Sequence, residues 1–433
     1  MYQRTILDNG LTVITERMPE FRSCSLGIWA KVGSRSERYE QAGLSHFLEH
    51  LLFKGTPARS AAEIAEAMDS VGGHINAFTE KESTCYYARV MDQHIPLAFE
   101  ILADMLLHSL LDEEEIEREK GVVLEEIKMY EDAPDEVIFD LFTRTLWGND
   151  PLGRPVIGRR EVVGSLTRQE LKGYMGRHYG PQNLLVAAAG QVDHDAFVAL
   201  VRRFLERDLA GSLSENGFVP PRSKPTVCVR QKDCEQAYMC YGCDGLSQVD
   251  ERRYAMLVLD SVLGGSMSSR LFQEIREKRG LVYSVGTFQN SYVDCGIFGV
   301  YASTSAERLP QVLELTRSIL CTLRADGITP TEFERAREHL KGSIALALES
   351  TSSRMMRLAR CEHYHRRLIS LEEVIERIDA VTPEQVSELT EWLLEPSRYT
   401  LAVLGPVSEV DGVPARPMLP GATAAAEAAR LGG

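Results

Sequence analysis

Three side chains in residues 43–55, GLSHFLEHLLFKG, have the types and spacing for metal-assisted chemistry. His46 and His50 are four residues apart and Glu49 is three from His46, so on a helix all three project from one face. Two imidazoles one turn apart present nitrogens to a single point, as a tetrahedral metal requires, and the carboxylate beside them could take a proton from water. The alternative is a pair of core histidines whose nitrogens are satisfied by neighbouring groups.

The same segment predicts the element that carries these side chains. Large apolar residues fill the remaining directions of the helix, namely Leu44, Phe47, Leu48, Leu51 and Leu52. A helix that is apolar nearly all round is buried, so its one ionisable stripe must face a cavity or a polar site. Gly55 is expected to close the helix as its C-terminal cap.

A catalytic metal needs a third protein ligand and an open position for water. The helix expected over residues 112–129 offers Glu126, which stands among Val and Leu residues and is expected to be drawn inward with them. Glu119, seven residues earlier, lies on the same helical face and could orient a ligand histidine. Glu125 is rotated by about 100° and is expected to be exposed.

Length, composition and charge limit the classes of protein that the chain can belong to. Its 433 residues suffice for two domains of roughly 200 residues each. A hydrophobic share of 44% and a charged share of 26% are typical of soluble globular proteins. The net charge of −15 has the wrong sign for a nucleic-acid partner. No signal segment or run of about 20 apolar residues is found, so we expect no membrane partner and a cytoplasmic location.

Cysteine usage predicts reduced thiols. The nine cysteines are an odd number scattered over a long chain, which argues against a disulfide framework. Cys240 and Cys243 form one lone C-x-x-C pair, with no second pair or histidine cluster to complete a structural metal site. A redox protein built on this pair is an alternative, and it predicts sensitivity to thiol alkylation but indifference to chelators.

The order of the segments predicts an α+β fold with two tandem homologous domains. In each half, strand-like runs enclose helical stretches, which indicates a mainly antiparallel sheet with helices packed on it. Residues 210–226 are rich in Gly, Ser and Pro and predict an interdomain linker, and residues 411–433 predict a flexible tail. We therefore expect one domain at residues 1–209, carrying the metal site, and a second at residues 227–410.

The two halves match each other in order, which indicates a duplicated domain. The stretch EIEREKGVVLEEI from Glu115 matches EFERAREHLKGSI from Glu332, and FKGT from Phe53 matches LGGS from Leu263, at an offset of roughly 215 residues. The positions of the second half that match His46, Glu49, His50 and Glu126 hold Met256, Leu259, Asp260 and Ser343. The second half therefore cannot build the same metal site.

Several motifs together resemble the pitrilysin/insulinase family of zinc peptidases, in its two-domain bacterial form, which is similar to the mitochondrial processing peptidase β subunit. The matched stretches are HFLEH at 46–50, GGHINAFTEKE at 72–82, EKGVVLEEI at 119–127, PLGRPVIG at 151–158, YGPQN at 179–183 and LFQEIREKRGLVYSV at 271–285. HFLEH is the inverted zinc-peptidase motif. The resemblance implies that the two domains form half of a clamshell.

The resemblance also implies a role for each motif residue. The zinc ligands would be His46, His50 and Glu126, with one zinc ion per chain. Glu49 would be the general base and Glu119 a supporting carboxylate. Arg276 and Tyr283 would contact the substrate and the oxyanion, and Asn76 and Ala77 would offer backbone groups near the scissile bond. An extended peptide could add to the edge strand expected at residues 73–80.

The implied activity is that of a zinc-dependent endopeptidase acting on extended or unfolded oligopeptides, resembling a processing peptidase. The family resemblance further implies a homodimer in which Arg276 and Tyr283 complete each zinc site in trans. Two alternatives stay open: a heterodimer with a sister subunit, and a non-catalytic peptide-binding or structural subunit of such a peptidase. The intact histidine motif, with only Gly264 and Gly265 at the turn that is glycine-rich in such subunits, favours the enzyme.

Overall fold

The computed structural model describes residues 2–206, 209 and 217–417, which form two compact units, each with a six-stranded sheet. Unit 1 comprises Met1–Ile127, Pro155–Gly217 and Ala347–Leu368, and unit 2 comprises Lys128–Arg154, Phe218–Leu346 and Ile369–Gly433. Each unit thus includes a segment from the other half of the chain, which the contiguous domains expected at 1–209 and 227–410 do not include. Of the expected linker, residues 210–216 lie outside the described residues, and residues 217–226 contain no helix or strand.

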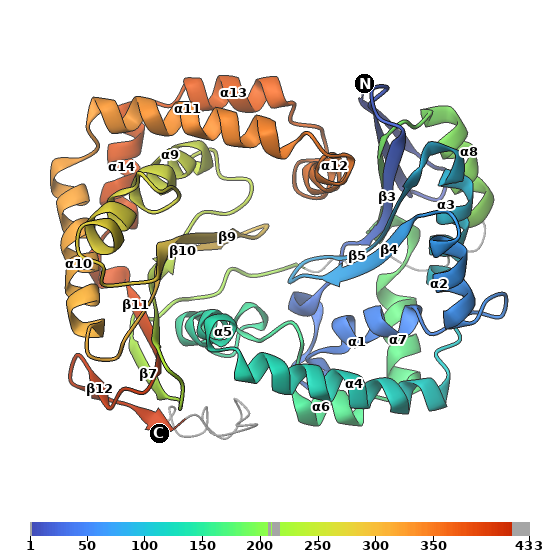
Figure 1. Cartoon of the computed structure of the whole chain (residues 1–433). Helices are drawn as coiled ribbons and strands as arrows, with labels where there is room; N and C mark the ends of the chain where they lie inside the picture. Colours follow the sequence, from blue (N-terminus) through green and yellow to red (C-terminus); the bar gives the residue numbers. More distant parts are fainter. Residues whose placement is uncertain (1, 207–208, 210–216, 418–433) are drawn as a thin grey trace. The chain divides into compact units, whose positions relative to one another are not determined.

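The sheet of unit 1 has the strand order β1-β2-β6-β3-β5-β4, of which Figure 1 labels β3, β5 and β4. Its strands are β1 (Tyr2–Ile6), β2 (Thr12–Arg17), β3 (Ser23–Ala30), β4 (His74–Thr79), β5 (Thr84–Met91) and β6 (Leu184–Gly190). β2 and β6 pair in parallel, and the other neighbours pair antiparallel. Because β4 ends the strand order, its outer backbone edge has no strand partner within the described part of this sheet.

The helices of unit 1 follow from amphipathic segments between the strands. They are α1 (Leu44–Leu52), α2 (Ala61–Asp69), α3 (Ile95–His108), α6 (Arg160–Ser165), α7 (Arg168–His178), α8 (His194–Leu205) and α12 (Thr351–His365), and α4 (Glu113–Asp132) begins in this unit and ends in unit 2. α3 ends two residues before Leu110, where the apolar stretch IPLAFEILADMLLHSL stops. Most of its apolar residues are buried, which explains why the sequence there is continuously hydrophobic.

The sheet of unit 2 repeats this arrangement in the order β14-β7-β11-β8-β10-β9. Its strands are β7 (Val227–Gln231), β8 (Ala237–Asp244), β9 (Ser284–Ser291), β10 (Gly296–Thr304), β11 (Thr400–Gly405) and β14 (Arg416–Pro417). The parallel β7–β11 pair stands where β2–β6 stands in unit 1. The predicted α+β class and the duplication are therefore confirmed.

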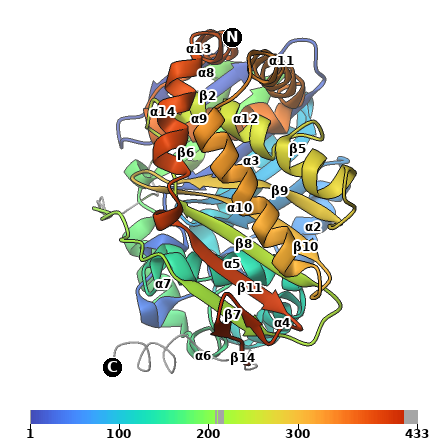
Figure 2. The ribbon, with the colours of Figure 1, turned by 90° about the vertical axis from the view of Figure 1, so that its left-hand side faces the viewer.

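The helices of unit 2 cover its sheet as in unit 1, and Figure 2 shows α10 and α14 in front of the strands. They are α5 (Pro134–Trp147), α9 (Arg253–Leu263), α10 (Leu309–Asp326), α11 (Pro330–Ala347), α13 (Leu371–Asp379) and α14 (Pro383–Leu393), with a π-helical turn at Phe272–Glu277.

The expected loose tail is wrong for residues 411–417. Val413–Pro414 (β13) pairs with Glu409–Val410 (β12), and β14 pairs in parallel with β7. β14 takes the place next to β7 that β1 takes next to β2 in unit 1, so the outer edge of β7 is covered. Residues 418–433 of the expected tail lie outside the described residues.

The central strands β6 and β11 of the two sheets are buried on both faces, which explains why their sequences are mostly apolar. Along β6, Leu184, Val186 and Ala188 belong to the core under α1, α3 and α8, and the alternate residues Leu185 and Ala187 belong to a second core. This second core is completed by Met355, Leu358 and Ala359 of α12. In unit 2, residues of α5 complete the equivalent second core against β8 and β11. The two exchanged segments therefore carry the helices that seal the sheets.

Polar contacts fix α12 to its sheet in addition to the apolar ones. The Arg4 guanidinium forms two bonds with the Glu362 carboxylate, at 2.9 and 2.8 Å, and Glu362 is almost completely buried. Ser25 Oγ lies 2.9 Å from Thr351 Oγ1 at the other end of the helix. The first half of the chain thus depends on a helix that the second half supplies (Figure 1).

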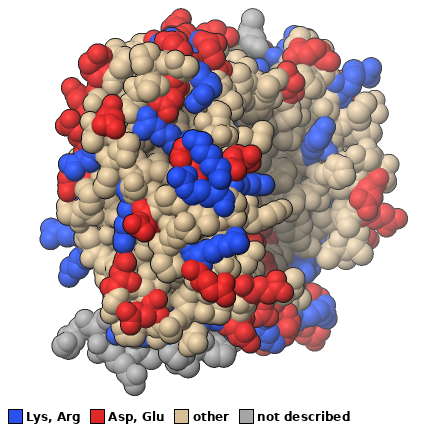
Figure 3. Space-filling model, turned by 60° about the vertical axis from the view of Figure 1, so that its left-hand side comes forward, with Lys and Arg blue, Asp and Glu red and all other residues tan. Residues whose placement is uncertain are grey.

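In the described part of the chain, no single helix is both long and apolar enough to cross a membrane; only the bent pair Asp92–His108 and Glu113–Asp132, taken together, passes on length and composition. Figure 3 shows acidic and basic side chains interspersed over the face that it presents, with no broad field of one sign.

We expect the substitution Met355→Ala to destabilise the first half of the chain although Met355 comes from the second. The side chain is fully buried in the second core of unit 1, so its truncation should lower the free energy of unfolding by about 2–5 kcal/mol. Urea unfolding followed by circular dichroism measures the change. Arg360→Ala, an exposed position on the same helix, is the control and should stay within about 0.5 kcal/mol of the parent. Equal stability of both variants would contradict the role of α12.

Candidate metal centre

The helix that carries the inverted histidine motif is α1. Its apolar residues Leu44, Phe47, Leu48, Leu51 and Leu52 are buried, while His46 and His50 remain partly accessible. The helix ends at Leu52 with Phe53 as its C-cap, so the predicted end at Gly55 was two residues too late. Gly55 instead takes φ 114° in the following turn.

The two imidazoles of α1 meet the carboxylate of Glu126 from α4. The centroids of the two rings lie 4.7 Å apart. His46 Nε2 lies 3.8 Å from Glu126 Oε1, and His50 Nε2 lies 3.5 Å from Glu126 Oε2. One ligand atom from each of the three residues lies within 4.8 Å of the other two. In the part of the chain that the structure describes, this is the only group of three or more histidine, cysteine or acidic side chains with such a geometry.

The polar atoms of this group fit a metal ion. Glu126 Oε2 is inaccessible to solvent and has no hydrogen-bond partner among the described residues. Burial and, to a lesser degree, the neighbouring His50 lower the pKa of His46 to about 4, so its ring is the neutral imidazole that a metal binds. Two nitrogens and one carboxylate oxygen suit zinc, which binds imidazole and carboxylate ligands. The Glu126 side chain is 44% exposed, less buried than its apolar neighbours suggested.

Glu119 lies on α4, seven residues before Glu126, and fixes the orientation of His50. Its Oε1 lies 2.8 Å from His50 Nδ1, and its Oε2 lies 2.6 Å from Lys54 Nζ. A carboxylate at Nδ1 favours the tautomer with the proton there, which leaves the lone pair of Nε2 directed toward Glu126. The Glu119 side chain is only 4% exposed, so Lys54 supplies the charge that a buried carboxylate needs.

Glu49 stands beside the two histidines with a hydrogen bond of its own. Thr79 Oγ1, at the end of β4, donates to Glu49 Oε2 at 2.5 Å. Burial raises the pKa of Glu49, and the bond from Thr79 opposes that shift. A raised pKa suits a carboxylate that must accept a proton and later release it.

Asn76 and Ala77 lie in the middle of β4, the strand that ends the sheet. They pair with Tyr87 and Tyr86 of β5 on one side. The other side of β4 is the unpaired edge described above, and β4 contacts α1. The expected edge strand at residues 73–80 is therefore present at His74–Thr79.

Arg276 and Tyr283 belong to unit 2 and lie close together there. Arg276 stands in the π-helical turn and Tyr283 directly precedes β9. The Arg276 guanidinium lies 5.5 Å from the centroid of the Tyr283 ring and 4.9 Å from that of Phe272. The Tyr283 ring is 77% exposed, which is unusual for a large aromatic residue.

Among the described residues of the second half there is no counterpart of the metal group. In α9 the positions of the motif hold Met256, Leu259 and Asp260, of which the first two are buried in the apolar core of unit 2. Burial raises the pKa of Asp260, and no histidine accompanies it on α9. The expectation that only the first half can build the site agrees with these positions.

The C-x-x-C alternative finds no support in the fold. Cys240 and Cys243 both lie on β8 and belong to two different apolar cores, because their odd spacing directs them to opposite faces of the strand. Both side chains are free and buried, and burial raises the pKa of the Cys240 thiol well above its usual range. Buried thiols that face apart can neither pair with each other nor share a metal.

Sequence reasoning missed two residues that contact Glu119 and Glu49. Lys54, the partner of Glu119, lies in the turn after α1, and its partner is 65 residues away in the sequence. Thr79 gave no local signal, because its partner Glu49 is 30 residues away. Only the meeting of β4 with α1 reveals this bond.

Comparison with known proteins follows the same division of the chain. Residues 12–160 match the family described as insulinase (peptidase family M16), and residues 165–340 match the peptidase M16 inactive domain. The first match contains the complete metal group, and the second contains none of its residues.

Relatives of similar length carry names that mention zinc. An uncharacterized zinc protease of Bacillus subtilis (strain 168) is 43% identical over 94% of this chain and 98% of its own. An uncharacterized zinc protease of Streptomyces coelicolor is 44% identical over 94% of this chain and 90% of its own. An uncharacterized zinc protease of Mycobacterium tuberculosis (strain H37Rv) is 44% identical over 93% of this chain and 93% of its own.

Solved structures show the same fold at low sequence identity. A peptidase M16 inactive domain from Pseudomonas fluorescens matches with a TM-score of 0.88 at 19% identity, covering 97% of this chain and 100% of that one. A protease from Helicobacter pylori matches with a TM-score of 0.86 at 23% identity, covering 94% of this chain and 99% of its own. Together with the matches above, these similarities establish that the chain belongs to the insulinase family, peptidase family M16.

Proposed function

We propose that this protein is a zinc-dependent endopeptidase that hydrolyses extended or unfolded oligopeptides, in the manner of a processing peptidase. The observation that carries the proposal is the convergence of His46, His50 and Glu126 within 4.8 Å, with Glu49 on the same face of α1. The names of the relatives, all zinc proteases, support the identity of the metal.

The side chains divide the chemistry of peptide hydrolysis among them. Zinc held by His46, His50 and Glu126 would supply Lewis acidity toward a water molecule and a peptide carbonyl. Glu49 takes the proton from the attacking water and passes it to the leaving amine. Its largely buried position raises its pKa, which makes the carboxylate a better proton acceptor. Glu119 keeps the ring of His50 in its binding orientation through the bond to Nδ1.

The edge of β4 suits a substrate in an extended conformation. An unpaired strand edge offers alternating N–H and C=O groups to a peptide that adds as a further strand. Asn76 and Ala77 lie on this edge, and Thr79 of the same strand holds Glu49. A bound peptide backbone would therefore run alongside the residues that perform the hydrolysis. The net charge of −15 favours basic peptides.

The Arg276 and Tyr283 pair suits the stabilisation of negative charge on the attacked carbonyl oxygen. A guanidinium and a phenol both donate hydrogen bonds, and the exposed Tyr283 ring is accessible to a substrate. We propose that the pair acts on the zinc site of a second, identical chain, so that the active enzyme is a homodimer with sites completed in trans.

Removal of the metal should abolish cleavage of a quenched basic peptide, and added zinc should restore it. Glu49→Gln should keep the zinc but lower kcat by about 10²–10⁴-fold, because it removes the proton acceptor alone. Metal content and hydrolysis are measured on the same preparations. An enzyme indifferent to chelators, or a Glu49→Gln variant with parental kcat, would contradict the mechanism and favour a peptide-binding subunit.

The neighbouring glutamates Glu125 and Glu126 give a matched pair of variants. Glu126→Gln should release zinc, since it removes a charged ligand, whereas Glu125→Gln should retain zinc and activity because Glu125 is exposed on α4. Glu119→Gln should weaken zinc binding by about 10–100-fold, as expected for a partner of a ligand histidine. Competition with a chromogenic chelator measures each affinity. Zinc loss in Glu125→Gln instead of Glu126→Gln would reassign the ligand.

Mixing two inactive variants tests completion in trans. Tyr283→Phe should lower kcat by about 10²–10³-fold through loss of one donor. If chains exchange freely, Glu49→Gln and Tyr283→Phe form mixed dimers in which one site is intact, so about a quarter of the parental activity returns. Recovery is followed after mixing, and dimers are verified by light scattering. Dimers that exchange chains but regain no activity would show that each chain completes its own site.

A further inference from the structure

The first turn of α1 is capped by a residue outside the helix. Its N-cap is Gly43, which has no side chain and adopts φ 99°. Glu37 takes over the capping role: its Oε2 accepts from the Gly43 N–H at 2.8 Å and its Oε1 accepts from the Ser45 N–H at 2.7 Å. Both oxygens of one carboxylate therefore bind N–H groups of the same helix end, which would otherwise be left without partners.

The surroundings of Glu37 leave this turn little freedom to move. The Glu37 residue is 3% exposed and Ser45 is completely buried. Ser45 Oγ lies 2.9 Å from the hydroxyl of Tyr174 on α7, which holds the turn from another side. A Cβ placed on Gly43 would come within 2.8 Å of the Cα of Gly158, so the backbone of the turn is packed against a neighbouring loop.

The turn held in this way carries the first metal ligand. His46 directly follows Ser45, and His50 lies one helical turn further on. The nine residues of α1 are held in two ways: its apolar side chains pack into the core, and its first turn is anchored by Glu37. A change of one residue position corresponds to a rotation of about 100°, and a small part of that rotation would turn both imidazoles away from Glu126.

The negative charge of Glu37, like its two hydrogen bonds, favours binding of a cation by α1. The N-terminal end of a helix carries a partial positive charge, which opposes a cation bound near its first turn. A buried carboxylate at that end offsets this charge. We propose that Glu37 is a positioning residue for the metal centre: it fixes the rotation of α1 and offsets the helix dipole so that His46 and His50 hold zinc together with Glu126. This inference rests on the zinc site proposed above.

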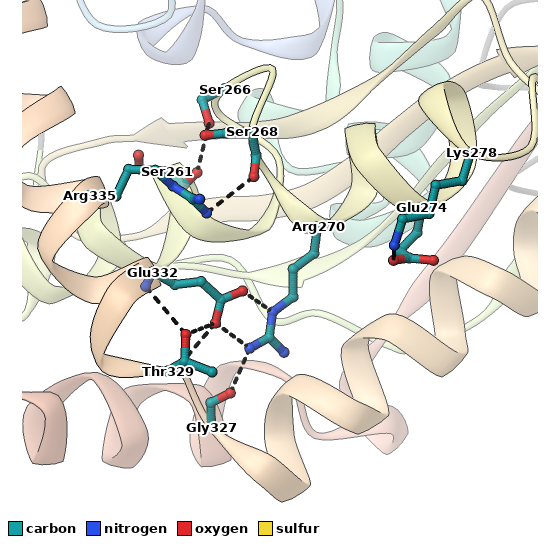
Figure 4. Close-up of polar contacts among 10 residues, drawn as sticks. All are labelled: Ser261, Ser266, Ser268, Arg270, Glu274, Lys278, Gly327, Thr329, Glu332 and Arg335. Atoms are coloured by element: carbon teal, nitrogen blue, oxygen red, sulfur yellow. Dashed lines mark hydrogen bonds and ion pairs between the residues drawn. The ribbon is translucent and has the colours of Figure 1, made fainter.

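An ordinary stabilising cap elsewhere in the chain provides a matched control. In unit 2, Glu332 accepts from the Thr329 N–H at 3.0 Å at the start of α11, and it pairs with the Arg270 guanidinium at 2.8 Å (Figure 4). Glu332, like Glu37, is a carboxylate that accepts from a backbone N–H group at the start of a helix, but α11 carries none of the proposed zinc ligands. Its loss should affect stability and leave zinc binding unchanged.

The test compares zinc affinity and stability in full-length variants. We expect Glu37→Gln, which loses the charge and one of the two acceptors, to raise the zinc Kd by about tenfold or more in competition with a chromogenic chelator. Glu332→Gln should leave the Kd within about twofold of the parent, even where urea unfolding shows comparable losses of stability for the two variants. If Glu37→Gln yields no folded protein, Glu37→Asp takes its place, with weaker binding expected because the shorter side chain cannot reach both N–H groups.

Two results would overturn the inference, and they differ in what else they affect. In the first result, the Glu37 variant binds zinc like the parent while the Glu126 variant loses zinc. This would show that Glu37 is a structural cap alone and would leave the proposed function intact. Absence of zinc binding by the parent protein would contradict the proposed function and this inference together.

Discussion

The site depends on bringing three ligand atoms from two separate helices to one point. α1 supplies two imidazoles one turn apart, and α4 supplies the carboxylate of Glu126. Leaving a buried polar atom such as Glu126 Oε2 without a partner costs about 1–3 kcal/mol. A cation bound between this carboxylate and the two imidazoles would offset that cost and hold α1 against α4. The bonds from Glu119 to His50 and from Thr79 to Glu49 then restrict how each side chain can turn.

The duplicated architecture separates this chemistry from the scaffold that supports it. The two sheets have equivalent strand orders, and the parallel pair β2–β6 of unit 1 corresponds to the parallel pair β7–β11 of unit 2. Only α1, however, carries the histidine motif. In α9 the same positions are filled by core residues and by Asp260, and that half carries instead the neighbouring Arg276 and the exposed Tyr283. The exchange of α5 and α12 between the halves means that neither sheet is sealed by its own half of the chain.

The sequence predicts those parts of the site that depend on spacing along one helix. The four-residue interval between His46 and His50 and the seven-residue interval between Glu119 and Glu126 place each pair on one face, and the structure has these arrangements. Contacts between distant segments leave no such pattern, so Thr79, Lys54 and Glu37 became visible only in three dimensions. Helical periodicity likewise does not say which sheet a helix covers, and this is why the exchange of α5 and α12 escaped prediction.

The most direct test of the central claim is zinc K-edge X-ray absorption on the purified full-length protein loaded with one equivalent of zinc. The account predicts a first shell of nitrogen and oxygen atoms only, at about 2.0–2.2 Å, with the outer-shell signature of two imidazoles. The Glu126→Gln variant should lose this spectrum. A shell containing sulfur at about 2.3 Å, as thiolate ligands would give, or a spectrum unchanged in Glu126→Gln would contradict the assignment of the site.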